Sequence, residues 1–304
     1  MNIKFPFRRR AITAIAASVL ILGACGGGGS ESADTTSPEQ SLKIVSLSPT
    51  ATEMLYAIGA GDQVVAVDSL STYPAEVASK VTKISAYEPS AEAILAYEPD
   101  VVLISNDMNK ITEQLTGANP EIEVWTGAAA ASLDDVYKQI NELGELTGHT
   151  SEAEELVSSM KARIDAAVSG RIRDIAFPVY YELDNTFYSV TSNTFVGELM
   201  NRFGLISIAD GVEEGNDYPQ LNAEAIVNAN PVIIFLADTK CCQQTAATVS
   251  ARAGWSGIAA VRDGNVVELD DDVASRWGPR VVDLIEQFGK AYDDLFPRKG
   301  PNGK

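Results

Sequence analysis

The sequence predicts an α/β protein of two lobes, each with a central, largely parallel sheet flanked by helices, joined by one long interlobe helix. Three observations support this fold class. From Leu42 onward, short β-rich runs alternate with helical stretches, which is the pattern of βαβ units. A long amphipathic helix is predicted in the middle of the chain, and similar segments recur on either side of it. The 304 residues are enough for two lobes with a sizeable core each.

The central helix is predicted over residues 152–169. Ser151 and Glu154 match the S-x-x-E capping box that satisfies free backbone N–H groups at a helix start, and Gly170 ends the helix. A helix of this length spans ~27 Å, enough to tie two lobes together side by side. One apolar face runs along it, made by Ala153, Leu156, Val157, Met160, Ile164, Ala167 and Val168. This periodicity also fits an ordinary amphipathic surface helix, and the repeat on either side favours the interlobe helix.

Two pairs of similar segments indicate internal duplication or pseudo-symmetry. Segment 90–94 (SAEAI) precedes a proline and a predicted strand, and segment 222–226 (NAEAI) does the same 132 residues later. In both, a small polar N-cap is followed two residues on by a glutamate. A second pair, 48–59 and 192–204, is offset by 144 residues. We therefore expect an N-terminal lobe over 42–150, the interlobe helix within 151–170, a C-terminal lobe over 171–296 and a tail over 297–304.

The expected elements follow from the period of the hydrophobic pattern and from the turn residues between runs. Strands are predicted at 44–47, 64–67, 83–85, 101–104, 122–125, 179–182, 187–190, 206–209, 232–236 and 266–269. Further helices are predicted at 50–58, 90–97, around Ile111 and Leu115, and at 132–146, 194–203, 223–229, 244–251 and 280–295.

The N-terminus has the features of an export signal. Lys4 and three arginines precede an apolar run, 11–24, that is shorter than the ~20 residues of a membrane-spanning helix. The run ends in Leu-Gly-Ala-Cys25, which resembles a bacterial lipobox, so residues 1–24 are expected to be a lipoprotein signal peptide and Cys25 the lipidated residue. A plain cleaved signal with an accidental cysteine is the alternative. The Gly/Ser-rich stretch 25–41 is expected to be a flexible tether.

Charge and the scarcity of catalytic residue types exclude several function classes. Without the leader, 19 Lys and Arg stand against 42 Asp and Glu, a net charge of −23, which argues against nucleic-acid binding. The single histidine, His149, excludes a His-based triad and a His-rich metal site, and no nucleophile-elbow or P-loop motif occurs. Cys241 and Cys242 are adjacent, and they could form a vicinal disulfide, remain buried thiols or face a ligand's metal.

The chain from about 42 to 295 resembles the substrate-binding proteins of ABC importers that use one rigid interlobe helix, and within that group the cobalamin-binding proteins. The resemblance is carried by 44–53 (IVSLSPTATE), 73–74 (YP), 88–92 (EPSAE), 218–224 (YPQLNAE) and 272–280 (DVASRWGPR). It implies a monomer that is no enzyme, has no cofactor or metal of its own, captures a cobalt corrinoid between its lobes and delivers it to an ABC permease dimer with its ATPase. It also implies an extracytoplasmic protein, attached to the outer face of the cell membrane only through its lipid anchor.

The same resemblance implies which residues contact the ligand. A corrin is a broad, mostly apolar disc with amide arms, to which flat aromatic rings and a few polar groups are suited. The matching positions are Tyr73, Tyr87, Phe187 and Tyr218 as aromatic contacts, Asp272 and Arg276 as hydrogen-bonding groups, and Trp277 as a stacking residue. The family often has Trp where this chain has Tyr87 and Tyr218. Asp272 and Arg276 also fit a simple i, i+4 ion pair.

Glu92 and Glu224, one in each half of the repeat, are implied to pair with arginines of the permease. The alternative is that each carboxylate only favours the dipole of its helix. Three other functions compete with cobalamin capture: binding of a ferric siderophore, binding of haem, and a role as a non-transport surface lipoprotein or lipoprotein enzyme. Anionic siderophores usually require several Lys or Arg in the cleft, in which this chain is poor.

Overall fold

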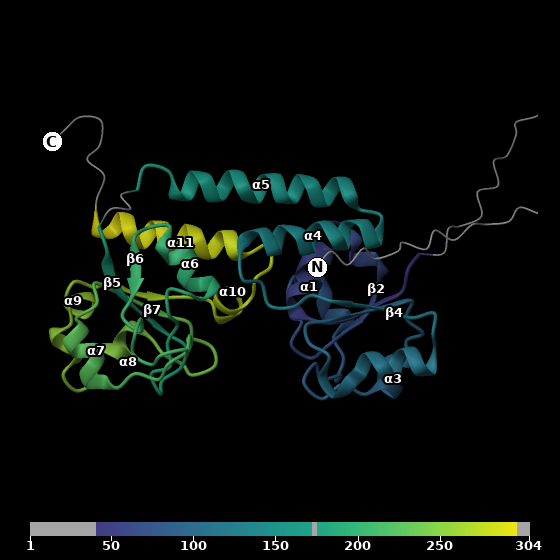
Figure 1. Cartoon of the computed structure of the whole chain (residues 1–304), viewed down its shortest axis with the longest axis horizontal. Helices are drawn as coiled ribbons and strands as arrows, with labels where there is room; N and C mark the ends of the chain where they lie inside the picture. The colour runs from purple at the N-terminus through teal and green to yellow at the C-terminus, as the bar shows by residue number, and fades with distance from the viewer. Residues whose placement is uncertain (1–40, 172–174, 297–304) are drawn as a thin grey trace, which may run out of the picture. The chain divides into compact units, whose positions relative to one another are not determined.

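The computed structural model describes residues 41–171 and 175–296; the leader, Cys25, the tether up to residue 40 and the tail 297–304 lie outside these residues. Two four-stranded sheets form the body, with strand orders β2-β1-β3-β4 and β6-β5-β7-β8, and every strand pair is parallel. Helices flank both sheets (Figure 1). The predicted fold class is thus confirmed, and the identical strand order of the two sheets agrees with the repeat in the sequence.

The N-terminal half contains four strands and four α-helices before the central helix. They are β1 (Ile44–Leu47), α1 (Pro49–Ala57), β2 (Val64–Val67), α2 (Ala91–Leu95), β3 (Val101–Ile104), α3 (Ile111–Ala118), β4 (Glu123–Thr126) and α4 (Leu133–Thr147). Short 3-10 helices lie at Ala60–Gln63, Ala75–Lys80 and Met108–Lys110. β1 and β3 are buried along their whole length, as expected for parallel strands covered on both faces.

The C-terminal half repeats this alternation and adds two short helices that were not predicted, α9 and α10. Its elements are β5 (Phe177–Glu182), α6 (Phe195–Asn201), β6 (Leu205–Ser207), α7 (Ala223–Ala229), β7 (Ile233–Leu236), α8 (Ala246–Ser250), α9 (Ala259–Arg262), β8 (Val266–Glu268), α10 (Asp271–Ser275) and α11 (Val281–Leu295). A 3-10 helix, Trp255–Gly257, lies between α8 and α9. No helix within 41–171 and 175–296 has the length and apolarity needed to cross a membrane.

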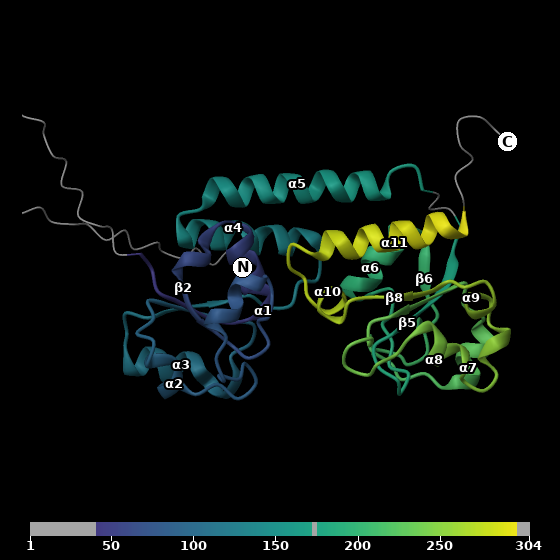
Figure 2. The ribbon, with the colours of Figure 1, turned by 180° about the vertical axis from the view of Figure 1, so that it is seen from behind.

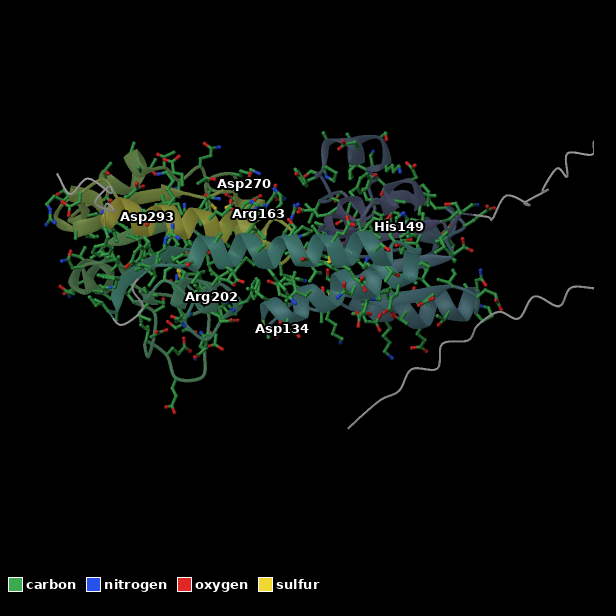
Figure 3. All side chains as sticks on the ribbon, turned by 90° about the horizontal axis from the view of Figure 1, so that it is seen from above. Asp134, His149, Arg163, Arg202, Asp270 and Asp293 are labelled. Atoms are coloured by element: carbon green, nitrogen blue, oxygen red, sulfur yellow. The ribbon has the colours of Figure 1, made fainter. Side chains whose placement is uncertain are left out.

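The central helix, α5 (Thr150–Val168), runs across both halves of the body (Figures 1 and 2). It packs on α4 of the N-terminal half and on α11 of the C-terminal half. Figure 3 looks onto α5, with His149 at its N-terminal end and Arg163 further along it. Arg163 binds Asp283 and Glu286 of α11 at 2.9 Å each. The buried face of α5 belongs to one continuous apolar core with residues of both sheets, so the predicted interlobe helix is present.

The predicted capping box at Ser151 and Glu154 is wrong. The N-cap is His149, which makes no side-chain cap hydrogen bond, and Ser151 already lies inside the helix. The reason is the tight connection from α4, which ends at Gly148 with a left-handed φ of 78°. Only Gly148 and His149 separate the two helices, so the start of α5 is fixed by this turn, whereas the end is at Ser169 and Gly170 as expected.

Two predicted strands, 83–85 and 187–190, are not strands. Near the first, only Val81 makes an isolated bridge, to Val67; in the second, only Tyr188 does, to Gln220. Phe187 has a φ of 73°, which breaks an extended run, and the residues after it pair with a loop at 217–219 instead of a sheet. β-Rich composition alone did not distinguish such paired loops from strands.

The two halves are also joined by an ion cluster between α1 and the segment that links α10 to α11. Glu53 of α1 is buried, with 2% of its side chain exposed, and accepts hydrogen bonds from Arg276 at 2.8 Å and from Arg280 at 2.6 and 2.8 Å. The Tyr73 ring lies over the Arg280 guanidinium, with 4.1 Å between the ring centroid and the guanidinium carbon. Hydrogen bonding to Glu53 raises the pKa of Arg280 further. Removing one member of a buried ion cluster of this kind is costly, because it leaves the charge of its partner buried without compensation.

Replacing Glu53 with Gln tests this junction. The amide keeps the shape of the side chain but leaves the largely buried Arg280 without its counter-charge and Arg276 with Asp272 alone, so we expect the free energy of unfolding in urea to fall by about 3–5 kcal/mol. Asp294→Asn, which removes the exposed Lys290–Asp294 pair of α11, is the matched control and should cost about 0.3–0.5 kcal/mol. Equal, small losses in both variants would contradict a structural role for the cluster.

Candidate functional site

A cavity of about 380 Å³ lies between the carboxyl ends of the N-terminal strands and the segment that follows α10. We call it the front cavity. Its lining includes Leu47, Asp68, Tyr87, Ile104, Asp272, Arg276 and Trp277. Leu47 and Ile104 end β1 and β3, and ligands of open α/β sheets bind outside this edge of the strands. The position and the mixed apolar and polar lining are those of a small-molecule site.

Arg276 is the only cation among the residues that line the front cavity, and it is already engaged. Its guanidinium donates to Glu53 at 2.8 Å, to Asp272 at 2.6 Å and to the backbone oxygen of Leu70 at 3.2 Å. Asp272 in turn accepts a hydrogen bond from Lys240 at 2.8 Å. The Asp272–Arg276 ion pair therefore exists, and it is one part of a larger cluster that connects the two halves of the body.

Asp68, which the sequence analysis did not single out, lies at the inner end of the front cavity. It is fully buried; Ser71 donates to its Oδ1, and its Oδ2 has no partner among the described residues. Burial raises the pKa of this carboxyl. Beside it, Thr52 and Ser46 continue a chain of hydroxyl hydrogen bonds. Nothing in the local pattern around residue 68 marks it, because its setting is created by the sheet.

Two predicted aromatic contacts line the front cavity. Tyr87 is 68% exposed, so its ring is available to a ligand. Trp277 packs against the core and donates from its indole N–H to Gln139 at 3.2 Å. Together with Asp272 and Arg276, four of the seven predicted ligand contacts thus lie around one cavity.

The other three predicted contacts lie elsewhere. Tyr73 stacks on Arg280 and does not line the front cavity. Phe187 packs between Trp255 and Arg252, with ring centroids 5.8 Å apart in the first pair. Tyr218, 55% exposed, stands on the loop before α7, as Tyr87 stands on the loop before α2. Tyr73 faces a second hollow, and Phe187 serves the packing of the C-terminal half.

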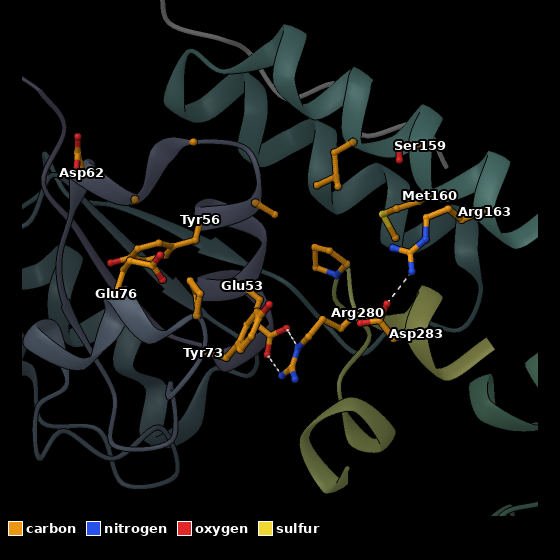
Figure 4. A pocket seen from close by; sticks show the side chains of 16 residues that line it. Glu53, Tyr56, Asp62, Tyr73, Glu76, Ser159, Met160, Arg163, Arg280 and Asp283 are labelled. Atoms are coloured by element: carbon orange, nitrogen blue, oxygen red, sulfur yellow. Dashed lines mark hydrogen bonds and ion pairs between the residues drawn. The ribbon is translucent and has the colours of Figure 1, made fainter. Parts of the chain in front are cut away.

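That second hollow, the rear cavity, has a volume of about 630 Å³ and lies beneath α5. Figure 4 shows Glu53, Tyr73 and Arg280 at its centre, with Arg163 and Asp283 on the far side. Glu53 lines the rear cavity, while its partner Arg276 lines the front cavity. One carboxylate therefore separates the two hollows.

The C-terminal half contains a buried ionic cluster at the same edge of its sheet. Glu182, at the end of β5, receives two hydrogen bonds from Arg252, at 2.5 and 2.6 Å, and Arg252 lies 4.5 Å from the ring centroid of Trp255. Asp238, which follows β7, is also fully buried, and neither of its carboxyl oxygens has a hydrogen-bond partner among the described residues. Burial and the nearby Glu182 carboxylate raise the pKa of Asp238 to about 7. The cluster thus holds two acids and one cation, and the second acid is mainly protonated below about pH 7.

Glu92 and Glu224 occupy equivalent places. Each is exposed in the first turn of its helix, α2 or α7, and a side chain caps each helix, Ser90 in one and Asn222 in the other. Both helices lie on the side of the body away from α5 (Figure 2). No hydrogen bond or ion pair to another described residue involves either carboxylate, so both are available to a partner.

Cys241 and Cys242 are free thiols on the loop after β7, with their sulfur atoms 2.6 Å apart. Cys241 is exposed and Cys242 is partly buried. Neither lines the front cavity, so the two sulfurs do not face the proposed ligand site.

Two parallel-sheet halves, a bridging helix and a cavity at the strand ends define a solute-binding protein of the ABC-transporter type. The family model described as "Periplasmic binding protein" matches residues 44–273, and the chain belongs to this family, whose members are extracytoplasmic. The chain is similar to the uncharacterized ABC transporter substrate-binding lipoprotein YvrC of Bacillus subtilis, with 34% identity over 86% of this chain and 84% of the relative. It is also similar to a cobalamin-binding protein of Halobacterium salinarum, with 31% identity over 82% of this chain and 69% of the relative.

Among solved structures, the chain resembles the periplasmic heme-binding protein RhuT from Roseiflexus, with a TM-score of 0.71 and 25% identity over 84% of this chain and 98% of that one. The relatives therefore agree on the class of protein and differ in the ligand that their names give. The ligand of this chain has to be argued from its own cavity.

The buried Asp238 predicts a pH dependence of stability. Its pKa in the folded protein exceeds the usual carboxyl value of about 4, so the folded state binds the proton more tightly than the unfolded chain does. The resulting stabilisation is present below about pH 4 and is lost as the pH rises through about 7. Relative to Asp238→Asn, the free energy of unfolding of the wild type should fall by at most about 1.4 kcal/mol per pH unit in this window. Parallel urea-denaturation profiles for both proteins would contradict this.

Proposed function

We propose that this protein captures cobalamin or a related amide-bearing corrinoid in the front cavity and delivers it, chemically unchanged, to an ABC permease. The observation that carries this proposal is the charge state of the cavity. Its charged lining residues are Asp68, Asp272 and Arg276, and the one guanidinium is already neutralised by Glu53 and Asp272. Such a site has no free cation for a carboxylate ligand, but it has acceptors and donors for amide groups.

The rest of the lining supports a flat, largely apolar ligand. Leu47, Leu70, Ile104 and Met108 supply aliphatic surface, and Tyr87 presents an exposed ring at the cavity. Aromatic faces contribute large contact areas to such ligands. The cobalamin-binding relative at 31% identity agrees with this ligand class.

Haem and ferric siderophores are the competing ligands, and the similarity to a heme-binding protein keeps haem as the second candidate. Haem carries two carboxylates, and the ferric complexes of catecholate and carboxylate siderophores are anionic. The Asp272 carboxylate at the front cavity would repel these groups, and Arg276 offers them little net attraction because Glu53 and Asp272 already balance its charge. The cavity chemistry therefore ranks an amide-bearing ligand above both.

Mixing the purified protein with cobalamin, haem and a siderophore panel, followed by desalting, tests the ligand class. We expect the cobalamin chromophore to remain with the protein and the others to be lost. Tyr87→Ala should weaken cobalamin binding by roughly 2- to 12-fold, the equivalent of about 0.5–1.5 kcal/mol for one aromatic contact. Tyr97→Ala removes an exposed ring at the end of α2, outside the cavity, and should leave affinity unchanged. Retention of haem instead of cobalamin would overturn the proposal.

The exposed Glu92 and Glu224 are proposed to dock the loaded protein on the permease. Their pseudo-symmetric positions suit a partner that presents two equivalent basic sites, and charge pairs at such an interface fix its register. We expect the double variant Glu92→Arg with Glu224→Arg to keep cobalamin affinity and to stop uptake into cells. Glu154→Arg with Glu155→Arg makes the same charge change on α5, on the opposite side of the body, and should keep both. Loss of affinity together with uptake in the first variant would defeat the docking role.

A further inference from the structure

The loop after β7 places two thiols side by side at an accessible point of the fold. Cys241 and Cys242 are consecutive residues, their sulfurs lie 2.6 Å apart, and Cys241 is exposed. The proposed function does not use them, because neither lines the front cavity. Paired thiols that solvent can reach are accessible to an oxidant.

This loop is held in place mainly by one carboxylate. Asp271, in the first turn of α10, accepts hydrogen bonds from the backbone N–H of Lys240 at 2.9 Å and of Cys241 at 2.8 Å. The same carboxylate accepts from the hydroxyl of Thr239 at 2.9 Å. The peptide immediately before the thiols is therefore fixed to α10 by one fully used carboxylate.

A second set of contacts connects the loop to the front cavity. The ammonium of Lys240 donates to Asp270 at 2.7 Å and to Asp272 at 2.8 Å. Asp272 lines the cavity and holds Arg276 at 2.6 Å. A movement of the backbone at residues 240–242 would thus shift the Lys240 ammonium. The extent to which Lys240 balances the negative charge of Asp272 at the cavity would then change.

We propose that Cys241 and Cys242 form a redox-controlled modification site, a vicinal disulfide whose formation adjusts the front cavity through Lys240 and Asp272. A two-electron oxidant of the disulfide or diazene class takes up the two thiol hydrogens. One S–S bond forms between the sulfurs, while the oxidant is reduced to two thiols or to a hydrazine. No atom of the bound ligand takes part. The adjustment of ligand binding rests on the proposed function, whereas the disulfide itself does not.

Closing this bond has to move the backbone. The α-carbons of consecutive residues are ~3.8 Å apart. This is less than the separation of about 4.4–6.8 Å that is usual for the α-carbons of disulfide-linked residues. The strain falls on the peptide between the two cysteines, next to Lys240. Desolvation and the neighbouring Cys242 thiol raise the pKa of Cys241 to about 12, so little thiolate is present at neutral pH and each redox state exchanges slowly.

Peptide mapping of the full chain tests the modification site. Trypsin cleaves after Lys240 and Arg252, so both thiols fall in one peptide, 241–252, separate from Cys25. After treatment with diamide and then iodoacetamide, we expect this peptide to carry no alkyl group and to be two hydrogens lighter, and after reduction to take up two alkyl groups. In Cys241→Ser, Cys242 should be alkylated after both treatments. Two alkyl groups in the diamide-treated wild type, or a disulfide between two copies of the chain, would overturn the proposal.

Cobalamin binding in both redox states tests the connection to the cavity. Because an exposed ion pair such as Lys240–Asp272 contributes up to about 1 kcal/mol, we expect the oxidised and reduced wild type to differ in affinity by up to about fivefold. Cys241→Ser should bind equally before and after diamide. Equal affinities in the two states of the wild type would refute the connection, and cobalamin binding by neither state would count against the proposed function while the disulfide result stands.

Discussion

The buried carboxylate of Glu53 is the interaction on which the arrangement of the two halves depends. It lies on α1 and pairs with two arginines that are 223 and 227 residues away in the sequence. Removing these charges from water is costly, and the cost is offset only when all three side chains have their full set of hydrogen bonds. The cluster therefore forms only when both sheets are folded and correctly placed. α5 supplies the apolar contact between the halves, and Glu53 supplies the directional one.

The same cluster determines what the front cavity offers to a ligand. Arg276 reaches the cavity because Glu53 draws its guanidinium across the junction, and Asp272 then completes its hydrogen bonds. An arginine in a binding site usually indicates an anionic ligand, but here carboxylates of the protein itself balance its charge. The surplus in the lining is acidic, with Asp68 buried behind Arg276. The structural junction itself thus leaves the lining of the front cavity without an unbalanced positive charge.

Most regular elements could be predicted from the sequence because each depends on local signals. β1, β2 and β3 begin and end at the residues predicted from their short β-rich runs, and the apolar face of α5 is the predicted one. The start of α5 was missed because a tight turn at Gly148 overrides the capping motif that begins three residues later at Ser151. In the site, Tyr87 and Arg276 were found through a motif resemblance. The roles of Glu53 and Asp68 could not be found this way, since their partners come together only through the sheet and the interlobe junction.

The two halves share their strand order and differ in their buried polar groups. At the carboxyl edge of the first sheet, hydroxyls of Ser46, Thr52 and Ser71 lead to one carboxyl, whereas the second sheet has the ionic cluster of Glu182 and Arg252 at the same edge. A hydroxyl chain can reorient its donors at little cost, but a bidentate ion pair cannot. The adaptable half also supplies most of the residues that line the front cavity, while Asp272, Arg276 and Trp277 come from the other half. The equal strand order of the two halves thus suits a partner with two equivalent sites. Their different buried polar groups suit a single ligand that contacts mainly one half.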